Sequence, residues 1–320
     1  MPRANQGPDA TVTNLTTYPL PLEAAKVGLK TSKGGLVGTT AHRLTEATSA
    51  TASRPTPSTY IDPRLHYVLV DEPGPVPLTR LVRTVPEGKV IPPSRNKAKV
   101  GPDNRVRITN TTAWPHRALG ALIVTYQDGK QFVGTGTLVN KHHVLTAGHL
   151  VYLKARGGWV TSVQFNAAQD EANVPYGSAF ATRLITFKGW KEEGLFEYDT
   201  GMLILDRDVG NQTGWMGLIT TEDEDLSGHQ VTVEGYPSDK GGRQRWGASA
   251  PLHDVESHLI KYDIFTALGE SGAGVYGVWP GFSYEHVCAN HQSGGHGITN
   301  QGSRLARDKF DRIVTEWLAK

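Results

Sequence analysis

Gly269-Glu-Ser-Gly-Ala-Gly274 is the stretch that decides the fold of this 320-residue chain. It places Ser271 in a glycine-rich turn, where small residues allow the backbone to take unusual dihedral angles. Upstream, Asp199 stands at the entrance to one apolar strand-like run, and His149 follows the end of another. The order His149, Asp199, Ser271 is one of the known chain orders of a Ser-His-Asp catalytic triad. These three motifs together predict a site for nucleophilic catalysis.

The three residue types suit hydrolysis of an acyl bond. A serine hydroxyl is a weak nucleophile unless a nearby histidine takes its proton, so we expect Ser271 to attack and His149 to act as general base and then acid. The histidine in turn needs a carboxylate that fixes its tautomer and stabilises the imidazolium, a role that falls to Asp199. The backbone N–H groups of Gly269 and Ser271 are expected to bind the oxyanion.

The chain from about residue 105 consists of short apolar runs separated by turn signals. Asp128-Gly129 between two such runs predicts a β-hairpin. A series of strands of this kind indicates two small β-barrels rather than a parallel sheet. The predicted strands are Leu122–Tyr126, Gln131–Val139, His143–Thr146, Thr200–Asp206, Gln230–Tyr236, Leu259–Phe265, Gly274–Val278 and Val287–His291.

The last segment has a different pattern, with apolar residues at three- and four-residue spacing, which predicts an amphipathic helix. The predicted fold class is therefore all-β, two antiparallel barrels followed by a C-terminal α-helix. The apolar helix positions are Leu305, Phe310, Ile313, Val314, Trp317 and Leu318.

Residues 1–99 are interpreted as a non-catalytic leader. Residues 31–59 are rich in Thr, Ser, Ala, Gly and Pro and lack sustained periodicity, which indicates disorder. Within the leader, Leu65–Val70 could form one short strand. The predicted domains are a largely disordered leader or pro-segment at 1–99 and a catalytic domain at 100–320.

The basic run Ser94-Arg-Asn-Lys-Ala-Lys99 lies where these two parts meet. One interpretation is a solvated linker. The other is a processing site, cut by an activating protease near Lys99–Val100, which frees a new N-terminus at Val100.

Charge and cysteine content narrow the function classes. The 33 Lys and Arg against 31 Asp and Glu imply no polyanionic partner, so no nucleic acid is expected. No stretch approaches the ~20 apolar residues of a membrane span, and the N-terminus shows no signal-peptide core. The sequence leaves open whether the chain stays inside, is exported by another route, or lacks its leader. The single cysteine, Cys288, excludes an intramolecular disulfide and is expected to be buried and inert. No metal or cofactor is expected.

These motifs resemble the chymotrypsin-fold serine endopeptidases, and within them the V8-type glutamyl endopeptidases, over roughly residues 100–320. Val233-Glu-Gly-Tyr-Pro-Ser-Asp-Lys240 resembles the family's Gly-Tyr-Pro-Gly-Asp-Lys segment. Lys261-Tyr-Asp-Ile-Phe-Thr266 resembles its Gln-Tyr-Asp-Leu-Ser-Thr, and His291-Gln-Ser-Gly-Gly295 its Ile-His-Trp-Gly-Gly. The resemblance implies two six-stranded chymotrypsin-like barrels, a pro-segment, secretion, and a monomer that cleaves proteins or peptides.

The resemblance also implies a preference for glutamate at the P1 position of the substrate, with aspartate slower. In the family a threonine and a histidine at the positions of Thr266 and His291 bind the P1 carboxylate, and in some members the freed α-amine, here of Val100, takes part. Hydroxyl, imidazole and ammonium groups all donate hydrogen bonds to carboxylates. Phe265 stands where a trypsin-like enzyme would need an acid to bind Lys or Arg, so basic specificity is disfavoured. The alternative is that Thr266 and His291 are ordinary strand residues.

The chain departs from the family pattern around the nucleophile. Glu270 replaces the usual Asn or Asp, Ala273-Gly274 replaces Ser-Pro, and Gln292-Ser293 replaces Trp. These changes bear on the pocket more than on the triad. Two other functions are alternatives. One is a weak or inactive protease homologue that binds proteins, which the intact triad disfavours. The other is an esterase, which would carry a strand-to-helix Gly-x-Ser-x-Gly elbow that the chain lacks.

Overall fold

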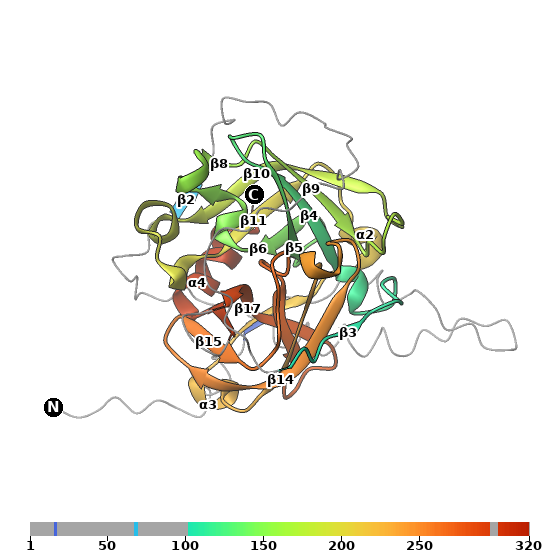
Figure 1. The fold of residues 1–320 in the computed structure, drawn as a ribbon. Coiled ribbons are helices and arrows are strands. Elements are labelled where there is room, and N and C mark those ends of the chain that lie inside the picture. The colour runs from blue at the N-terminus through green and yellow to red at the C-terminus, as the bar shows by residue number, and fades with distance from the viewer. Residues whose placement is uncertain (1–15, 18–66, 70–101, 295–299, 320) are drawn as a thin grey trace, which may run out of the picture.

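The computed structural model describes residues 16–17, 67–69, 102–294 and 300–319. These residues form two closed, six-stranded antiparallel β-barrels and one short C-terminal helix, as predicted (Figure 1). Within the described residues, no helix has the length and apolar character needed to cross a bilayer.

The first barrel is a sheet whose strand order is β11-β6-β5-β4-β9-β10, and the pairing of β11 with β10 closes it. It contains an apolar core that includes Leu122, Phe165 and Leu203, all fully buried. The strands are β4 (Leu119–Thr125), β5 (Gln131–Leu138), β6 (His143–Thr146), β9 (Ser162–Ala167), β10 (Ser178–Phe187) and β11 (Gly201–Leu205).

The second barrel has the order β17-β16-β13-β14-β15-β18 and is closed by the pairing of β17 with β18. Its separate core includes Val233, Tyr262 and Val275. The strands are β13 (Gln230–Gly235), β14 (Trp246–Val255), β15 (Leu259–Tyr262), β16 (Gly274–Val278), β17 (Glu285–Gly294) and β18 (Asn300–Arg304).

Shorter elements flank and connect the barrels. Strand β12 runs parallel to β17, β3 pairs with β14, β1 pairs with β12, and β2 pairs with β10. These strands are β1 (Thr16–Thr17), β2 (Tyr67–Leu69), β3 (Val106–Arg107), β7 (Tyr152–Leu153), β8 (Gly158–Trp159) and β12 (Gly217–Thr220). The helical turns are η3 (His116–Ala118), η4 (Gly148–Leu150), η5 (Lys154–Arg156), η6 (Gly189–Glu193), η7 (Phe196–Tyr198), α2 (Gly210–Thr213), α3 (Asp223–Leu226) and η8 (Ser238–Lys240).

The C-terminal helix is α4 (Arg307–Arg312), which continues into the wider π-type turn η9 (Ile313–Trp317). Its predicted apolar face is buried, with Phe310, Ile313 and Trp317 at 0% exposure. The indole of Trp317 lies 4.5 Å, centroid to centroid, from the ring of Phe187 on β10. The helix follows the second barrel in the chain but closes a core that contains side chains of the first.

Several sequence predictions are confirmed closely. The Asp128-Gly129 hairpin joins β4 to β5, and Gly129 has a φ of +75°, which a side chain would disfavour. The strands His143–Thr146 and Gly274–Val278 have their predicted bounds. The strand predicted at Leu259–Phe265 ends at Tyr262, because the chain then leaves the sheet toward the serine turn. The sequence did not predict β9, β10, β12, β14 and β18.

Two further predictions concern the leader and the cysteine. The strand predicted within Leu65–Val70 is present as β2, whereas residues 31–59, the basic run at 94–99 and Val100 lie outside the described residues. Cys288 on β17 is 2% exposed, and burial raises the pKa of its thiol to about 12. The prediction that Cys288 is buried is confirmed. A thiol that stays protonated is a poor nucleophile, so we still expect this residue to be inert.

Candidate active site

His149 lies in turn η4, directly after β6 and the small residues Ala147 and Gly148. Its backbone N–H donates to Oδ1 of Asp199 at 2.7 Å, and its ring Nδ1 lies 2.9 Å from Oδ2. With the carboxylate as acceptor, Nδ1 carries the proton and Nε2 is left as the basic nitrogen. Glycine suits position 148, because a Cβ there would lie 2.8 Å from Cδ1 of Trp190 and 3.0 Å from Oδ1 of Asp199.

Asp199 lies between η7 and β11 and is 1% exposed. Both its carboxylate oxygens bind His149, and its backbone carbonyl accepts a hydrogen bond from Nδ2 of Asn290 at 2.8 Å. The hydroxyl of Thr200 binds Oδ1 of the same asparagine at 2.7 Å. Strand β17 of the second barrel therefore holds the backbone of Asp199, whose carboxylate orients a histidine of the first barrel.

Ser271 lies in a turn between β15 and β16 and is 9% exposed. The turn has two glycines with positive φ, Gly269 at +98° and Gly272 at +86°. It is bound on both sides: the carbonyl of Ser271 accepts from the N–H of Thr135 at 2.9 Å, and the N–H of Gly272 donates to the carbonyl of His291 at 2.7 Å. The predicted glycine-rich turn is thus built into the contact between the barrels.

The serine turn packs directly against the elements that carry the histidine. A Cβ at Gly272 would overlap Oγ1 of Thr146 and would come within 3.0 Å of the backbone nitrogen of Ala147. These two residues immediately precede the turn of His149. The fold therefore brings the three motifs of the predicted triad to one place, the seam between the barrels.

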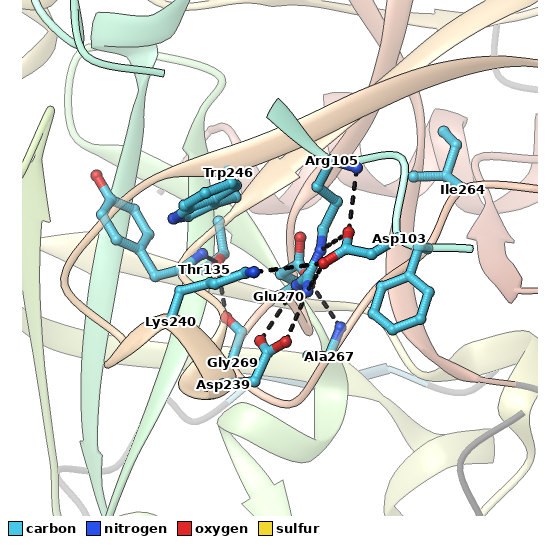
Figure 2. Close-up of polar contacts among 12 residues, drawn as sticks. Asp103, Arg105, Thr135, Asp239, Lys240, Trp246, Ile264, Ala267, Gly269 and Glu270 are labelled. Atoms are coloured by element: carbon cyan, nitrogen blue, oxygen red, sulfur yellow. Dashed lines mark hydrogen bonds and ion pairs between the residues drawn. The ribbon is translucent and has the colours of Figure 1, made fainter. Parts of the chain in front are cut away.

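Glu270, the residue that departs from the family pattern, is buried beneath the turn with its side chain 1% exposed. Its Oε2 accepts hydrogen bonds from Nη1 of Arg105 at 2.8 Å and from the N–H of Ala267 at 2.6 Å (Figure 2). Burial raises the pKa of Glu270 to about 8, although the Arg105 cation opposes that shift. The sequence singled out Glu270 only as a departure, and nothing in it marked Arg105 as its partner.

The two residues expected to recognise an acidic side chain both adjoin the serine turn. His291 pairs with Ala273 and Gly272 through its backbone, is 1% exposed, and has Nδ1 at 2.7 Å from the hydroxyl of Tyr262. Burial lowers the pKa of His291 to about 3, and the charge on His149 adds to that shift. Thr266 is half-buried and immediately precedes the residue whose N–H binds Glu270.

Comparison with known proteins identifies the family. A family model described as Trypsin matches residues 109–302. A protein named extracellular metalloprotease from Bacillus subtilis is 33% identical over 215 residues, which are 67% of this chain and 68% of that protein. A glutamyl endopeptidase from Bacillus licheniformis is 32% identical over 226 residues, 69% of each chain.

Solved structures agree on the fold. A Glu endopeptidase in complex with MPD superimposes with a TM-score of 0.60 at 24% identity, and the match covers 69% of this chain and 99% of that chain. The protease Anisep from Arthrobacter nicotinovorans gives a TM-score of 0.51 at 20% identity, with 59% and 90% covered.

The name of the Bacillus subtilis relative refers to a metal. Among the residues that the structure describes, no group of three or more acidic, histidine or cysteine side chains is arranged to hold a metal ion. The family model covers more than half of the chain and spans both barrels. The chain therefore belongs to the trypsin family of serine endopeptidases.

Proposed function

We propose that the chain hydrolyses peptide bonds through an acyl-enzyme formed on Ser271. His149 takes the serine proton and later gives it to the leaving amine, while Asp199 holds the imidazole and stabilises its charged form. The N–H groups of Gly269 and Ser271 bind the oxyanion of the tetrahedral intermediate.

The observation that carries this proposal is the paired hydrogen bonding of His149 and Asp199. One carboxylate oxygen binds the histidine backbone and the other its ring Nδ1, at 2.7 and 2.9 Å. Two contacts fix both the position and the rotation of the imidazole, which a general base requires. The packing of Gly272 against Thr146 and Ala147 supports Ser271 as its partner.

We further propose that cleavage follows glutamate, with aspartate slower, and that Thr266 and His291 bind the acidic side chain. An imidazole with a pKa of about 3 is neutral at pH 7 and offers one N–H donor to a carboxylate. The hydroxyl of Tyr262 at Nδ1 would select the tautomer of that imidazole. The glutamyl endopeptidase relative from Bacillus licheniformis supports the same preference.

The triad is tested by labelling with a fluorophosphonate, which reacts only with an activated serine. Labelling of the wild-type chain should be lost in Ser271→Ala and in His149→Ala, while both variants remain folded by circular dichroism. A wild-type chain that binds protein substrates without being labelled would instead indicate an inactive homologue.

The specificity is tested with a peptide library that varies the P1 residue. Cleavage after Glu should dominate in the wild type, and His291→Leu should lose that preference while it keeps the label on Ser271. Equal rates after Glu, Phe and Lys in the wild type would refute acidic specificity.

We also propose a role for residues 1–99. We expect the leader to keep the domain at 100–320 latent until an activating protease cuts near Lys99–Val100, in a protein that is exported. N-terminal sequencing of active material should begin close to Val100, whose α-amine is then free to contribute to the pocket. Full activity of the intact chain would contradict latency.

A further inference from the structure

The residue before the proposed nucleophile is a buried acid with two strong donors. Oε2 of Glu270 accepts from Nη1 of Arg105 at 2.8 Å and from the backbone N–H of Ala267 at 2.6 Å. The side chains of Arg105 and Glu270 are 0% and 1% exposed. A carboxyl group out of contact with water is costly unless it is paired, so this link is a strong constraint on the local backbone.

Arg105 joins three separate parts of the molecule through one guanidinium group (Figure 2). Its Nε lies 2.9 Å from Oδ1 of Asp103, and its Nη2 lies 2.7 Å from Oδ2 of Asp239 in turn η8. The guanidinium also stacks over the ring of Phe265 at 4.7 Å. The planar fork of arginine suits several carboxylates at once, which a lysine ammonium does not.

The contacts of Glu270 close the turn on which the oxyanion donors lie. Its own N–H donates to the carbonyl of Ala267 at 3.2 Å while its side chain accepts from the N–H of the same residue. Within this turn Gly269 takes a φ of +98°. The N–H of Ser238, next to Asp239, donates to the carbonyl of Leu268 at 2.6 Å. The backbone of residues 267–270 is therefore held by hydrogen bonds to the side chain of Glu270 and to Ser238, which lies next to Asp239, a partner of Arg105.

We propose that Arg105 is a positioning residue for peptide hydrolysis: through Glu270 its guanidinium holds the turn at Gly269–Ser271 in the conformation that binds the oxyanion. This rests on the proposed function of Ser271. Because Arg105 acts through another side chain and touches no substrate in this scheme, its loss affects the transition state more than substrate binding. It should lower kcat while KM changes little.

The test compares Arg105→Ala and Arg105→Lys with Arg107→Ala as the matched control. Arg107 lies two residues further along and pairs on the surface with Asp170, with its side chain 37% exposed. The measurements are kcat and KM on a peptide substrate, the rate of fluorophosphonate labelling, and thermal unfolding. We expect kcat to fall about tenfold to a hundredfold in Arg105→Ala, less than the loss of a whole oxyanion donor, and about threefold to tenfold in Arg105→Lys. Arg107→Ala should stay within about twofold of the wild type.

Chemical rescue separates positioning from general destabilisation. Ethylguanidinium at millimolar concentration should restore part of the kcat of Arg105→Ala, because the small cation can replace the missing group beside Glu270. It should not restore Ser271→Ala. Equal kcat for Arg105→Ala and Arg107→Ala, or a loss that follows the unfolded fraction and is not rescued, would overturn the proposal.

Two outcomes keep this proposal distinct from the proposed function. A wild-type chain that fluorophosphonate does not label contradicts the role of Ser271. A labelled wild type with an Arg105→Ala variant that matches the control contradicts only the role of Arg105. If Arg105→Ala does not fold, the kcat and KM of Arg105→Lys decide the question, since a fold-competent variant with wild-type kcat would overturn it equally.

Discussion

Asp199 in the first barrel and Ser271 in the second are held in place by different kinds of interaction. Asp199 is braced by neutral groups, the amide of Asn290 on its carbonyl and the hydroxyl of Thr200 beside it. The turn of Ser271 is held by the contact of the Arg105 guanidinium with the buried, titratable carboxyl group of Glu270. The contacts that hold Asp199 should therefore respond to the loss of neutral hydrogen bonds, and the contact that holds the serine turn should respond to pH.

The largest effect is expected from Asp199→Asn. The amide would present an N–H to Nδ1 of His149 and favour the wrong tautomer, so kcat should fall by about 10⁴-fold with little change in the fold. Steady-state kinetics and circular dichroism measure the two parts of this prediction. A loss below tenfold would mean that Asp199 does not orient the base.

A smaller effect, on stability, is expected from Asn290→Leu. This change removes the hydrogen bonds of Asn290 to Asp199 and Thr200 without a large change of side-chain volume. The buried carbonyl of Asp199 loses its side-chain donor, at a cost of about 1–3 kcal/mol in the free energy of unfolding, while the hydroxyl of Thr200 can still bind Ser303 at 2.9 Å. Since the lost groups carry no charge, the cost should be the same at pH 6 and pH 8 in urea unfolding. Asn211→Leu, at an exposed position in α2, is the control and should stay within about 0.5 kcal/mol.

Glu270→Gln should instead change the pH dependence of stability. The folded-state pKa of Glu270 is about 8, above its ordinary value of 4.5, so the folded chain holds a proton that the unfolded chain releases. The free energy of unfolding therefore falls as pH rises from about 4.5 to 8, by up to about 1.4 kcal/mol per pH unit. The glutamine variant lacks this slope, and urea unfolding at pH 5, 6, 7 and 8 would detect it. Parallel curves for the two chains would contradict the prediction.

Lys309→Met, in the C-terminal helix, should change the pH dependence of stability in the opposite direction. The Nζ of Lys309 is buried, donating to the carbonyl of Glu197 and to Ser303 at 2.6 Å each, and burial lowers its pKa from 10.5 to about 7. The unfolded chain binds a proton that the folded chain lacks, so stability rises between about pH 7 and 10.5 in the wild type. The methionine variant should lose this rise, as measured by urea unfolding at pH 7, 8 and 9. A rise kept in the variant would assign the slope to other groups.

The parts of the structure that the sequence predicts are those with a local signal. The Asp128-Gly129 turn, the apolar strand at His143–Thr146 and the spacing around Trp317 each carry their pattern within a few residues. Strand β14, Trp246–Val255, has Gly, Ala, Pro and Asp where a strand usually has β-branched residues, and its conformation comes from pairing with β13. Tertiary contacts decide this pairing, so the sequence pattern of the segment itself does not predict a strand.

The same distinction applies to the candidate site. His149, Asp199 and Ser271 each stand in a short motif, and their predicted roles remain proposals that the contacts of His149 with Asp199 support. Arg105 stands in no motif, because its proposed role depends on its contact with Glu270, a residue 165 positions away. The contact joins residues on either side of most of the barrel strands, so no short stretch of sequence encodes it.

The packing of the C-terminal helix affects how the protein folds during synthesis. Phe310, Ile313 and Trp317 fill a core that also contains Ile185 and Phe187 of the first barrel. On the ribosome this segment emerges after every barrel strand, so the packing over Ile185 and Phe187 is completed last. A chain truncated before this helix would leave these apolar side chains uncovered, and we expect it to be less stable than the full domain.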